Sequence, residues 1–92
     1  MATNEEEQLL LMGNDADALL KQEGFMRVVN SLVENTFQSF VNSKPDESEI
    51  RESLYHQYRA LILIMETLQQ RVAVRDQIVE KRDDANNQQV EV

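Results

Sequence analysis

A long stretch without helix-breaking residues dominates this sequence, since neither glycine nor proline occurs between Glu47 and Asp83. Apolar residues recur within the stretch at steps of four and three, which is typical of a helix that packs against another helix. These positions are Ile50, Leu54, Tyr58, Leu61, Met65, Leu68 and Val72. The pattern predicts one continuous helix over 47–83, about 55 Å long at about 1.5 Å per residue.

Within this predicted helix, six apolar residues follow one another from Ala60 to Met65. A helix with one buried face needs apolar residues only at every third or fourth position. The run therefore places Leu63 and Ile64 on sides that the helix hairpin does not cover. Exposed apolar patches usually mark contacts with other molecules, so we expect a second chain to bury part of this helix. The predicted protein interface consists of Ile62, Leu63, Ile64, Leu68, Val72, Arg75 and Val79.

Arg75 is the one charged member of this set and occupies the position that follows Val72 in the apolar stripe. A polar residue in such a stripe can set the register of association. Arg75 would then pair with an acidic group of another chain. The alternative is that the packed stripe simply ends at Val72.

Two shorter helices are predicted before the long one. Residues 25–43 carry apolar side chains at spacings that fit a period of 3.6. Pro45 disfavours helical geometry at Lys44, and Asp46 lies three residues before Glu49, as in a capping box. Further upstream, Gly13 is expected to end an apolar stretch, Asn14 or Asp15 to cap a short helix over 15–22, and Gly24 to close that helix in the left-handed conformation.

The chain of 92 residues is short enough to form one domain. The predicted fold is all-α, an antiparallel helical hairpin with a short N-terminal helix and a long C-terminal helix, and it is expected to self-associate. Residues 1–14 are expected to form an acidic, mobile N-terminal segment, and residues 15–83 to form the hairpin domain. Residues 84–92 are polar without periodicity, which predicts a disordered tail.

The composition of the chain excludes several classes of function. The net charge is −8, with no cysteine and one histidine, so disulfides are excluded and binding to nucleic acid or anionic membranes is not expected. No stretch has the length of a membrane helix or the character of a signal peptide. No phosphate-binding loop or nucleophile motif occurs, and His56 is interpreted as a half-exposed polar residue of the helix. We therefore expect neither enzyme activity nor a metal, a cofactor or a small-molecule substrate.

The segment KPDESEIRESLYHQYRALILIMETL resembles a pattern of small helical proteins encoded among the virion structural genes of tailed bacteriophages. The matching residues are Pro45, Asp46, Arg51, Glu52, Leu54, Tyr55, Arg59, Ala60 and Leu61. ALLKQEGFMRVVNSL resembles the upstream part, and the resemblance covers about residues 16 to 75, whereas the acidic N-terminal segment departs from it. The resemblance implies a location in the virion or the host cytoplasm, and a structural or assembly role beside a larger capsid or connector protein.

Two functions follow as hypotheses. The first is a non-enzymatic bacteriophage structural or assembly protein that associates with itself and with a larger phage protein through its helices. The second is an acidic regulator or inhibitor of a host protein, whose N-terminal carboxylates imitate a nucleic-acid backbone. Salt separates the two hypotheses, because ionic strength weakens contacts between charges far more than it weakens helix packing.

Overall fold

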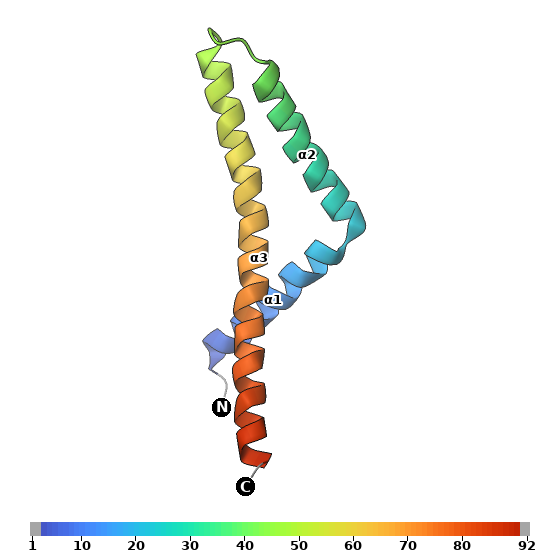
Figure 1. The fold of residues 1–92 in the computed structure, drawn as a ribbon, viewed down its shortest axis with the longest axis vertical. Helices are drawn as coiled ribbons and strands as arrows, with labels where there is room; N and C mark the ends of the chain where they lie inside the picture. The colour runs from blue at the N-terminus through green and yellow to red at the C-terminus, as the bar shows by residue number, and fades with distance from the viewer. Residues whose placement is uncertain (1–2, 91–92) are drawn as a thin grey trace.

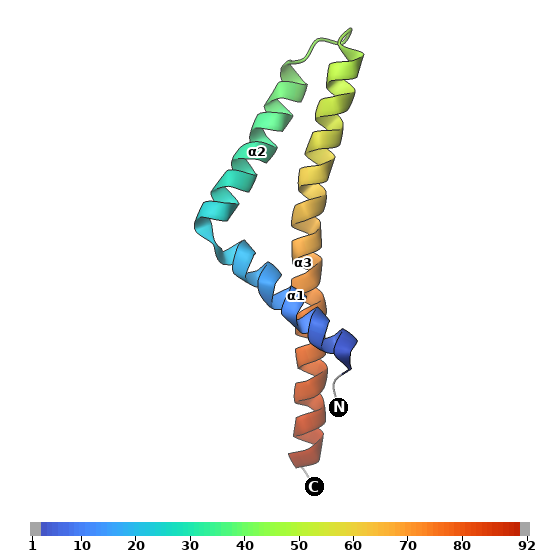
Figure 2. The same ribbon diagram turned by 180° about the vertical axis from the view of Figure 1, so that it is seen from behind.

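The computed structural model describes residues 3–90, and this part of the chain is folded as three helices without strands. They are α1 (Asn4–Lys21), α2 (Glu23–Asn42) and α3 (Ser48–Val90). The all-α prediction with a long C-terminal helix is confirmed. As Figures 1 and 2 show, α3 runs the length of the molecule. Helix α2 lies antiparallel beside the first half of α3, and α1 crosses the second half. The molecule measures 70 × 24 × 21 Å.

The turn between α2 and α3 contains Pro45, as predicted, but its hydrogen bonds differ from the predicted capping box. The carboxylate of Glu47 accepts a hydrogen bond from the backbone N–H of Lys44 at 2.8 Å. The N–H of Glu47 in turn donates to the carbonyl oxygen of Lys44 at 3.0 Å. Glu47 thus closes the turn, and the box expected between Asp46 and Glu49 is replaced by this pair of bonds.

The end of α2 is fastened to the start of α3 by Arg51. Its guanidinium lies 4.8 Å from the centre of the Phe40 ring, a distance at which a cation is attracted to the ring face. The same guanidinium donates to the carbonyl oxygen of Ser43 at 3.4 Å. The hairpin end is therefore held by side chains on both sides of the turn.

Helix α1 begins much earlier than expected, and the prediction of a break at Gly13 is wrong. Thr3 caps the helix, because its hydroxyl accepts a hydrogen bond from the N–H of Glu6 at 3.0 Å. The helix then passes through Gly13, which is buried against α3. Residues 4–14 are thus helical, and the first two residues of the segment predicted to be mobile lie outside the described range.

The join between α1 and α2 also differs from its prediction. Gln22 separates the two helices, and its backbone is extended, with φ −81° and ψ 109°. Gly24 lies inside the first turn of α2, and no glycine in the described range has a positive φ. The expected left-handed closure at Gly24 is therefore wrong, since a single extended residue makes the bend.

Helix α3 continues past Asp83, where the helix was expected to end. Residues 84–90, predicted to be disordered, extend the helix to Val90. No glycine or proline interrupts the backbone there, so the pattern of hydrogen bonds within the helix is not broken. The last two residues of the predicted tail lie outside the described range.

Candidate protein-interaction surface

The core of the molecule is small and lies where α1 and α2 meet α3. The buried hydrophobic residues of the described chain are Ala16, Val29 and Leu68, which are 1%, 7% and 8% exposed. Gly13 and Ala16 lie one turn apart on α1, and their small size lets this helix approach α3 closely. A Cβ at Gly13 would overlap the Cβ of Arg75 and lie 2.8 Å from the carbonyl oxygen of Arg71. The crossing therefore depends on a residue without a side chain.

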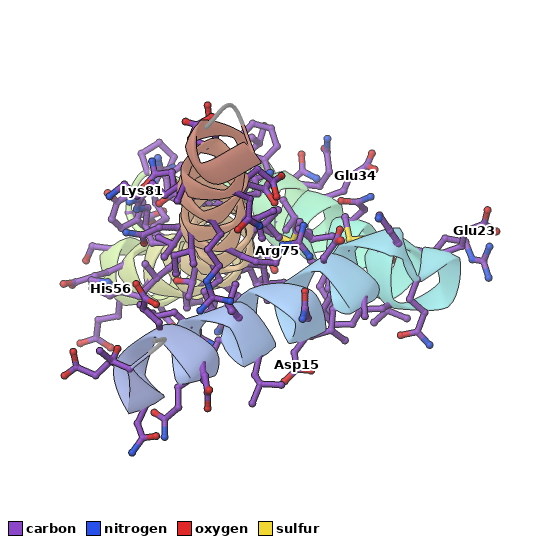
Figure 3. All side chains as sticks on the ribbon, turned by 90° about the horizontal axis from the view of Figure 1, so that it is seen from below. Asp15, Glu23, Glu34, His56, Arg75 and Lys81 are labelled. Atoms are coloured by element: carbon purple, nitrogen blue, oxygen red, sulfur yellow. The ribbon has the colours of Figure 1, made fainter. Side chains whose placement is uncertain are left out.

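Arg75 fastens the crossing with hydrogen bonds to α1. Its Nη1 donates to Asn14 Oδ1 and to Asp17 Oδ2, both at 3.0 Å. The side chains of Arg75 and Asp17 are only 18% and 23% exposed. Figure 3 shows Arg75 between the two helices, whereas Asp15 points away from α3. Arg75 thus finds an acidic partner, Asp17, within its own chain.

Arg75 is also bonded within α3, and a second ion pair extends the attachment of α1 to α3. Nε and Nη2 of Arg75 donate to Asp76 Oδ1 at 3.1 and 2.9 Å. Near the start of α1, Arg82 Nη2 donates to Glu6 Oε2 at 3.2 Å. Two ion pairs more than one helical turn apart therefore hold α1 along α3.

The ion pair changes the proton affinity of both partners. The hydrogen bond from Arg75, with a further one from Lys21, holds the pKa of Asp17 below its ordinary value of 3.8. The carboxylates of Asp76 and Asp17 raise the pKa of Arg75. Asp17 therefore keeps its negative charge, and the attachment of α1 to α3, to lower pH than an isolated aspartate would.

The predicted interface residues fall into three groups in the structure. Leu63, Ile64 and Val79 are 59%, 49% and 43% exposed and therefore free to contact another molecule. Ile62, Val72 and Arg75 are half-buried, and Leu68 is buried by its own chain. The predicted set is therefore not one continuous surface, because Arg75 is bonded to α1 and Leu68 belongs to the core.

A second exposed apolar surface lies near the hairpin turn. We call it the aromatic face, and it consists of Phe37, Phe40, Val41, Tyr55 and Tyr58. Phe37, Val41 and Tyr55 are 47%, 55% and 51% exposed, and the rings of Phe37 and Tyr58 lie 6.0 Å apart at 45°. The four aromatic residues alone line a cavity of about 260 Å³.

The sequence prediction missed the aromatic face, although a signal for it exists. The midpoint in sequence between Phe40 and Tyr55 falls between residues 47 and 48. Phe37 and Tyr58 have the same midpoint. An antiparallel hairpin that turns just before this point brings such pairs side by side. The apolar run after Arg59 lies within one segment and is the stronger signal in the sequence, so the sequence predicts the interface there.

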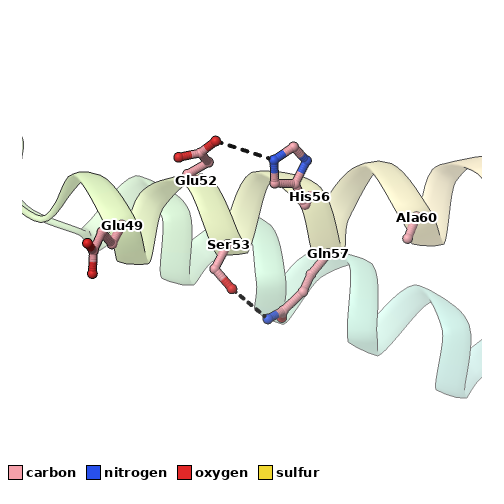
Figure 4. Close-up of a pocket in the computed structure, with 6 residues that line it drawn as sticks. All are labelled: Glu49, Glu52, Ser53, His56, Gln57 and Ala60. Carbon is pink, nitrogen blue, oxygen red and sulfur yellow. Dashed lines mark hydrogen bonds and ion pairs between the residues drawn. The ribbon is translucent and has the colours of Figure 1, made fainter.

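His56 lines a shallow hollow on the surface of α3, and Figure 4 shows the residues around it. His56 Nε2 lies 3.6 Å from Glu52 Oε1, and both side chains are largely exposed. Ser53 Oγ accepts a hydrogen bond from Gln57 Nε2 at 3.4 Å. The serine hydroxyl is thus engaged by an amide and not by the imidazole, so the arrangement lacks the pairing of nucleophile and base that activates serine.

Comparison with protein-family models, with curated proteins and with solved structures gave no match. Between residues 3 and 90 there is no cluster of three or more acidic or histidine side chains arranged to hold a metal ion. None of the helices in that range is at once long and apolar enough to pass through a bilayer.

Proposed function

We propose that this chain is a non-enzymatic assembly protein that acts by helix-mediated association, first with a second copy of itself and then with a larger protein. The resemblance of residues 44–68 to small helical proteins of tailed bacteriophages supports a place in a phage particle or in its assembly pathway. The larger partner would then be a phage structural protein.

The observation that carries the proposal is the amount of surface that the chain leaves uncovered. It exposes 7304 Å², whereas a compact monomer of 10.7 kDa exposes about 5,500 Å². The excess of about 1,800 Å² is larger than the ~800 Å² that each partner contributes to an ordinary stable interface. The excess is more than twice the area that one ordinary contact covers on each partner, which leaves room both for a second copy and for a larger protein.

The nature of the exposed surface points in the same direction. Only three hydrophobic residues are buried in the described part of the chain, while large side chains such as Leu32, Leu63 and Ile64 remain about half exposed. A small core supplies little stability to a chain of this length, and association is a common way to add more. Covering these side chains by a second molecule therefore stabilises the fold as well as the assembly.

The experiment is sedimentation equilibrium of the full chain over a series of concentrations, with native mass spectrometry on the same samples. We expect a reversible increase of mass above that of one chain. A single copy at every concentration would overturn the self-association that the proposal requires. Circular dichroism on each sample serves as a control, because it separates a folded monomer from an unfolded chain.

A second candidate function is supported by the position of the N-terminal carboxylates. A protein that imitates nucleic acid must carry its negative charges on a rigid face, and Glu5, Glu7 and Asp15 all stand exposed on the folded helix α1. Binding of a basic host protein to this helix would weaken strongly as salt rises. Retention of such a complex at high salt would contradict mimicry.

A further inference from the structure

We infer that two copies of this chain exchange helix α1. In the exchanged form α1 and α2 of each copy join into one continuous helix over residues 4–42, and α1 docks on α3 of the other copy. The inference rests on the self-association proposed above, and it specifies the segment and the site through which the copies associate. Reciprocal exchange of one element is a low-cost route to a dimer, because it reuses a contact that the single chain already makes.

The site for α1 on α3 is already built, and it fits α1 of any copy. Gly13 lets the two helices approach closely. Arg75 donates to Asp17, and Arg82 donates to Glu6. A second copy presents the same residues in the same order, so the exchanged form keeps each of these contacts. The area that α1 covers is also kept, and no new surface has to be found.

The charges of the two segments are complementary. Helix α1 carries five carboxylates against one lysine. Its contacts on α3 run from Arg71 to Arg82, and residues 71–82 carry four cations against two carboxylates. The acidic helix of a second copy is therefore attracted to this part of α3, although each whole chain has a net charge of −8.

The residues at the bend do not require it. Gln22 makes no side-chain hydrogen bond to the start of α2, and neither a proline nor a glycine with positive φ lies there. In a continuous helix the N–H groups of Glu23, Gly24 and Phe25 would each donate to a carbonyl oxygen four residues before them. Straightening therefore adds backbone hydrogen bonds, and the docking of α1 on its own α3 is what holds the bend.

The spacing of α1 and α2 also passes through the bend without a change of phase. Around Gln22 the positions of the stripe follow one another at steps of three and four, and they are Ala16, Leu19, Glu23, Met26, Asn30 and Val33. Two of these six are polar, but the spacing is kept. Such a series is typical of one long helix, so the sequence suits the continuous form as well as the bent one.

Straightening would carry α1 away from its own α3. Figures 1 and 2 show that α2 leans away from α3 toward the bend, where the two helices are well separated. A straight helix over residues 4–42 is about 58 Å long at about 1.5 Å per residue, and its first half points further outward still. The site on α3 is then open to α1 of the second copy.

The test is Glu23→Pro, which fits the bent chain and excludes the continuous helix. Glu23 is the first residue of α2, where proline is favoured, and the extended Gln22 before it has the geometry that proline imposes on its neighbour. Within a continuous helix the same proline would lack an N–H and clash with the preceding turn. We expect dimerisation to weaken by more than about a hundredfold in sedimentation equilibrium.

The matched control is Glu23→Ala, which removes the same side chain but places a good helix former at the position. The side chain of Glu23 is 91% exposed, and its carboxylate lies 3.9 Å from the Arg27 guanidinium, so its loss disturbs no packed contact. Glu23→Ala should dimerise at least as strongly as the unaltered chain. Circular dichroism of dilute Glu23→Pro should show the helicity and melting temperature of the unaltered monomer, which separates a loss of dimer from a loss of fold.

Cross-linking identifies the chain on which α1 is docked. The carboxylate of Glu6 lies 3.2 Å from the Arg82 guanidinium, and Arg82→Lys keeps the positive charge there and supplies an amine that a carbodiimide joins to that carboxylate. Dimers are formed from equal amounts of isotope-labelled heavy chains and unlabelled light chains. After proteolysis, exchange predicts cross-linked pairs in which the peptide around position 6 is heavy and the peptide around position 82 is light, or the reverse.

Each outcome separates this inference from the proposed function. If the unaltered chain stays a monomer at every concentration, both fail. If it dimerises but every cross-linked pair is wholly heavy or wholly light, or if Glu23→Pro dimerises as well as Glu23→Ala, self-association stands and the exchange of α1 is refuted. An assembly of more than two copies also contradicts reciprocal exchange.

Discussion

Gly13 of α1 and Arg75 of α3 approach so closely that no methyl group fits between the two helices. The nearest obstacles to a Cβ at Gly13 are the Cβ of Arg75 and the backbone oxygen of Arg71. Neither of them is the movable end of a side chain. The helices would have to separate to accept any other residue at this position.

We therefore predict that Gly13→Ala destabilises the fold by up to about 2 kcal/mol. Alanine favours a helix over glycine by about 1 kcal/mol, but forcing extra volume into a close contact costs about 1–3 kcal/mol. The matched control is Gly24→Ala, where the nearest atom to a new Cβ is Arg27 Nη2 at 3.9 Å. That change should be neutral or stabilising. Urea unfolding of both variants measures the two effects, and a stabilised Gly13→Ala would contradict the close crossing.

Stability should depend on pH through Asp17. Its pKa is lowered in the folded chain by the hydrogen bond from Arg75, so the folded state holds the charged form more strongly than the unfolded state does. The resulting stabilisation is present above the ordinary value of 3.8 and is lost as the pH falls through the lowered pKa. Thermal melting of the unaltered chain and of Asp17→Asn should therefore differ at neutral pH and converge in acid.

Asp15→Asn is the control for that experiment. Asp15 stands two residues away on α1 and points away from α3 (Figure 3). Removing its charge should leave the pH dependence of melting close to that of the unaltered chain. A loss as large as that of Asp17→Asn would show that general charge repulsion, and not the bond to Arg75, sets the pH dependence.

Leu68 is expected to contribute more to stability than any exposed leucine of α3. It is 8% exposed, and truncating a buried leucine to alanine costs about 2–5 kcal/mol through lost burial and the remaining cavity. Leu63→Ala, at 59% exposure, should change the stability of the dilute protein by no more than about 0.5 kcal/mol. Chemical denaturation at one low concentration compares them, and equal losses would contradict the burial of Leu68 in the core.

Glu47 should matter more than Asp46 for the hairpin turn. Its carboxylate accepts the hydrogen bond from Lys44, and loss of a comparable capping bond costs about 0.5–2 kcal/mol. Glu47→Ala should therefore lower the melting temperature more than Asp46→Ala does. The opposite order would support the capping box that the sequence pattern predicts.

Local signals in the sequence were sufficient for most of the fold. The proline turn and the spacing of apolar residues predicted the hairpin, because these features act on neighbouring residues. The prediction that Gly13 ends a helical stretch is wrong. A glycine can end a helix or let another helix come close, and only the packing of α1 on α3 decides between these roles. The same is true of Arg75, whose partner Asp17 lies 58 residues away in sequence.

The candidate surface was only partly predictable for a related reason. The apolar run around Leu63 and Ile64 is visible in one segment, and both side chains are indeed exposed. The aromatic face joins Phe37 of one helix to Tyr55 of another, so it exists only once the register of the hairpin is known. Surfaces built from two helices need the fold before they can be recognised.

The single helix α3 has a consequence for the dimensions of the molecule. Its 43 residues span about 65 Å at about 1.5 Å per residue, which is nearly the whole 70 Å length of the protein. Helix α2 lies beside it and α1 crosses it, so the other two helices add little to this dimension. The length of α3 therefore sets the length of the molecule, and seven residues inserted after Arg82 would move the C-terminal end of α3 outward by about 10 Å while the hairpin and the crossing stayed in place.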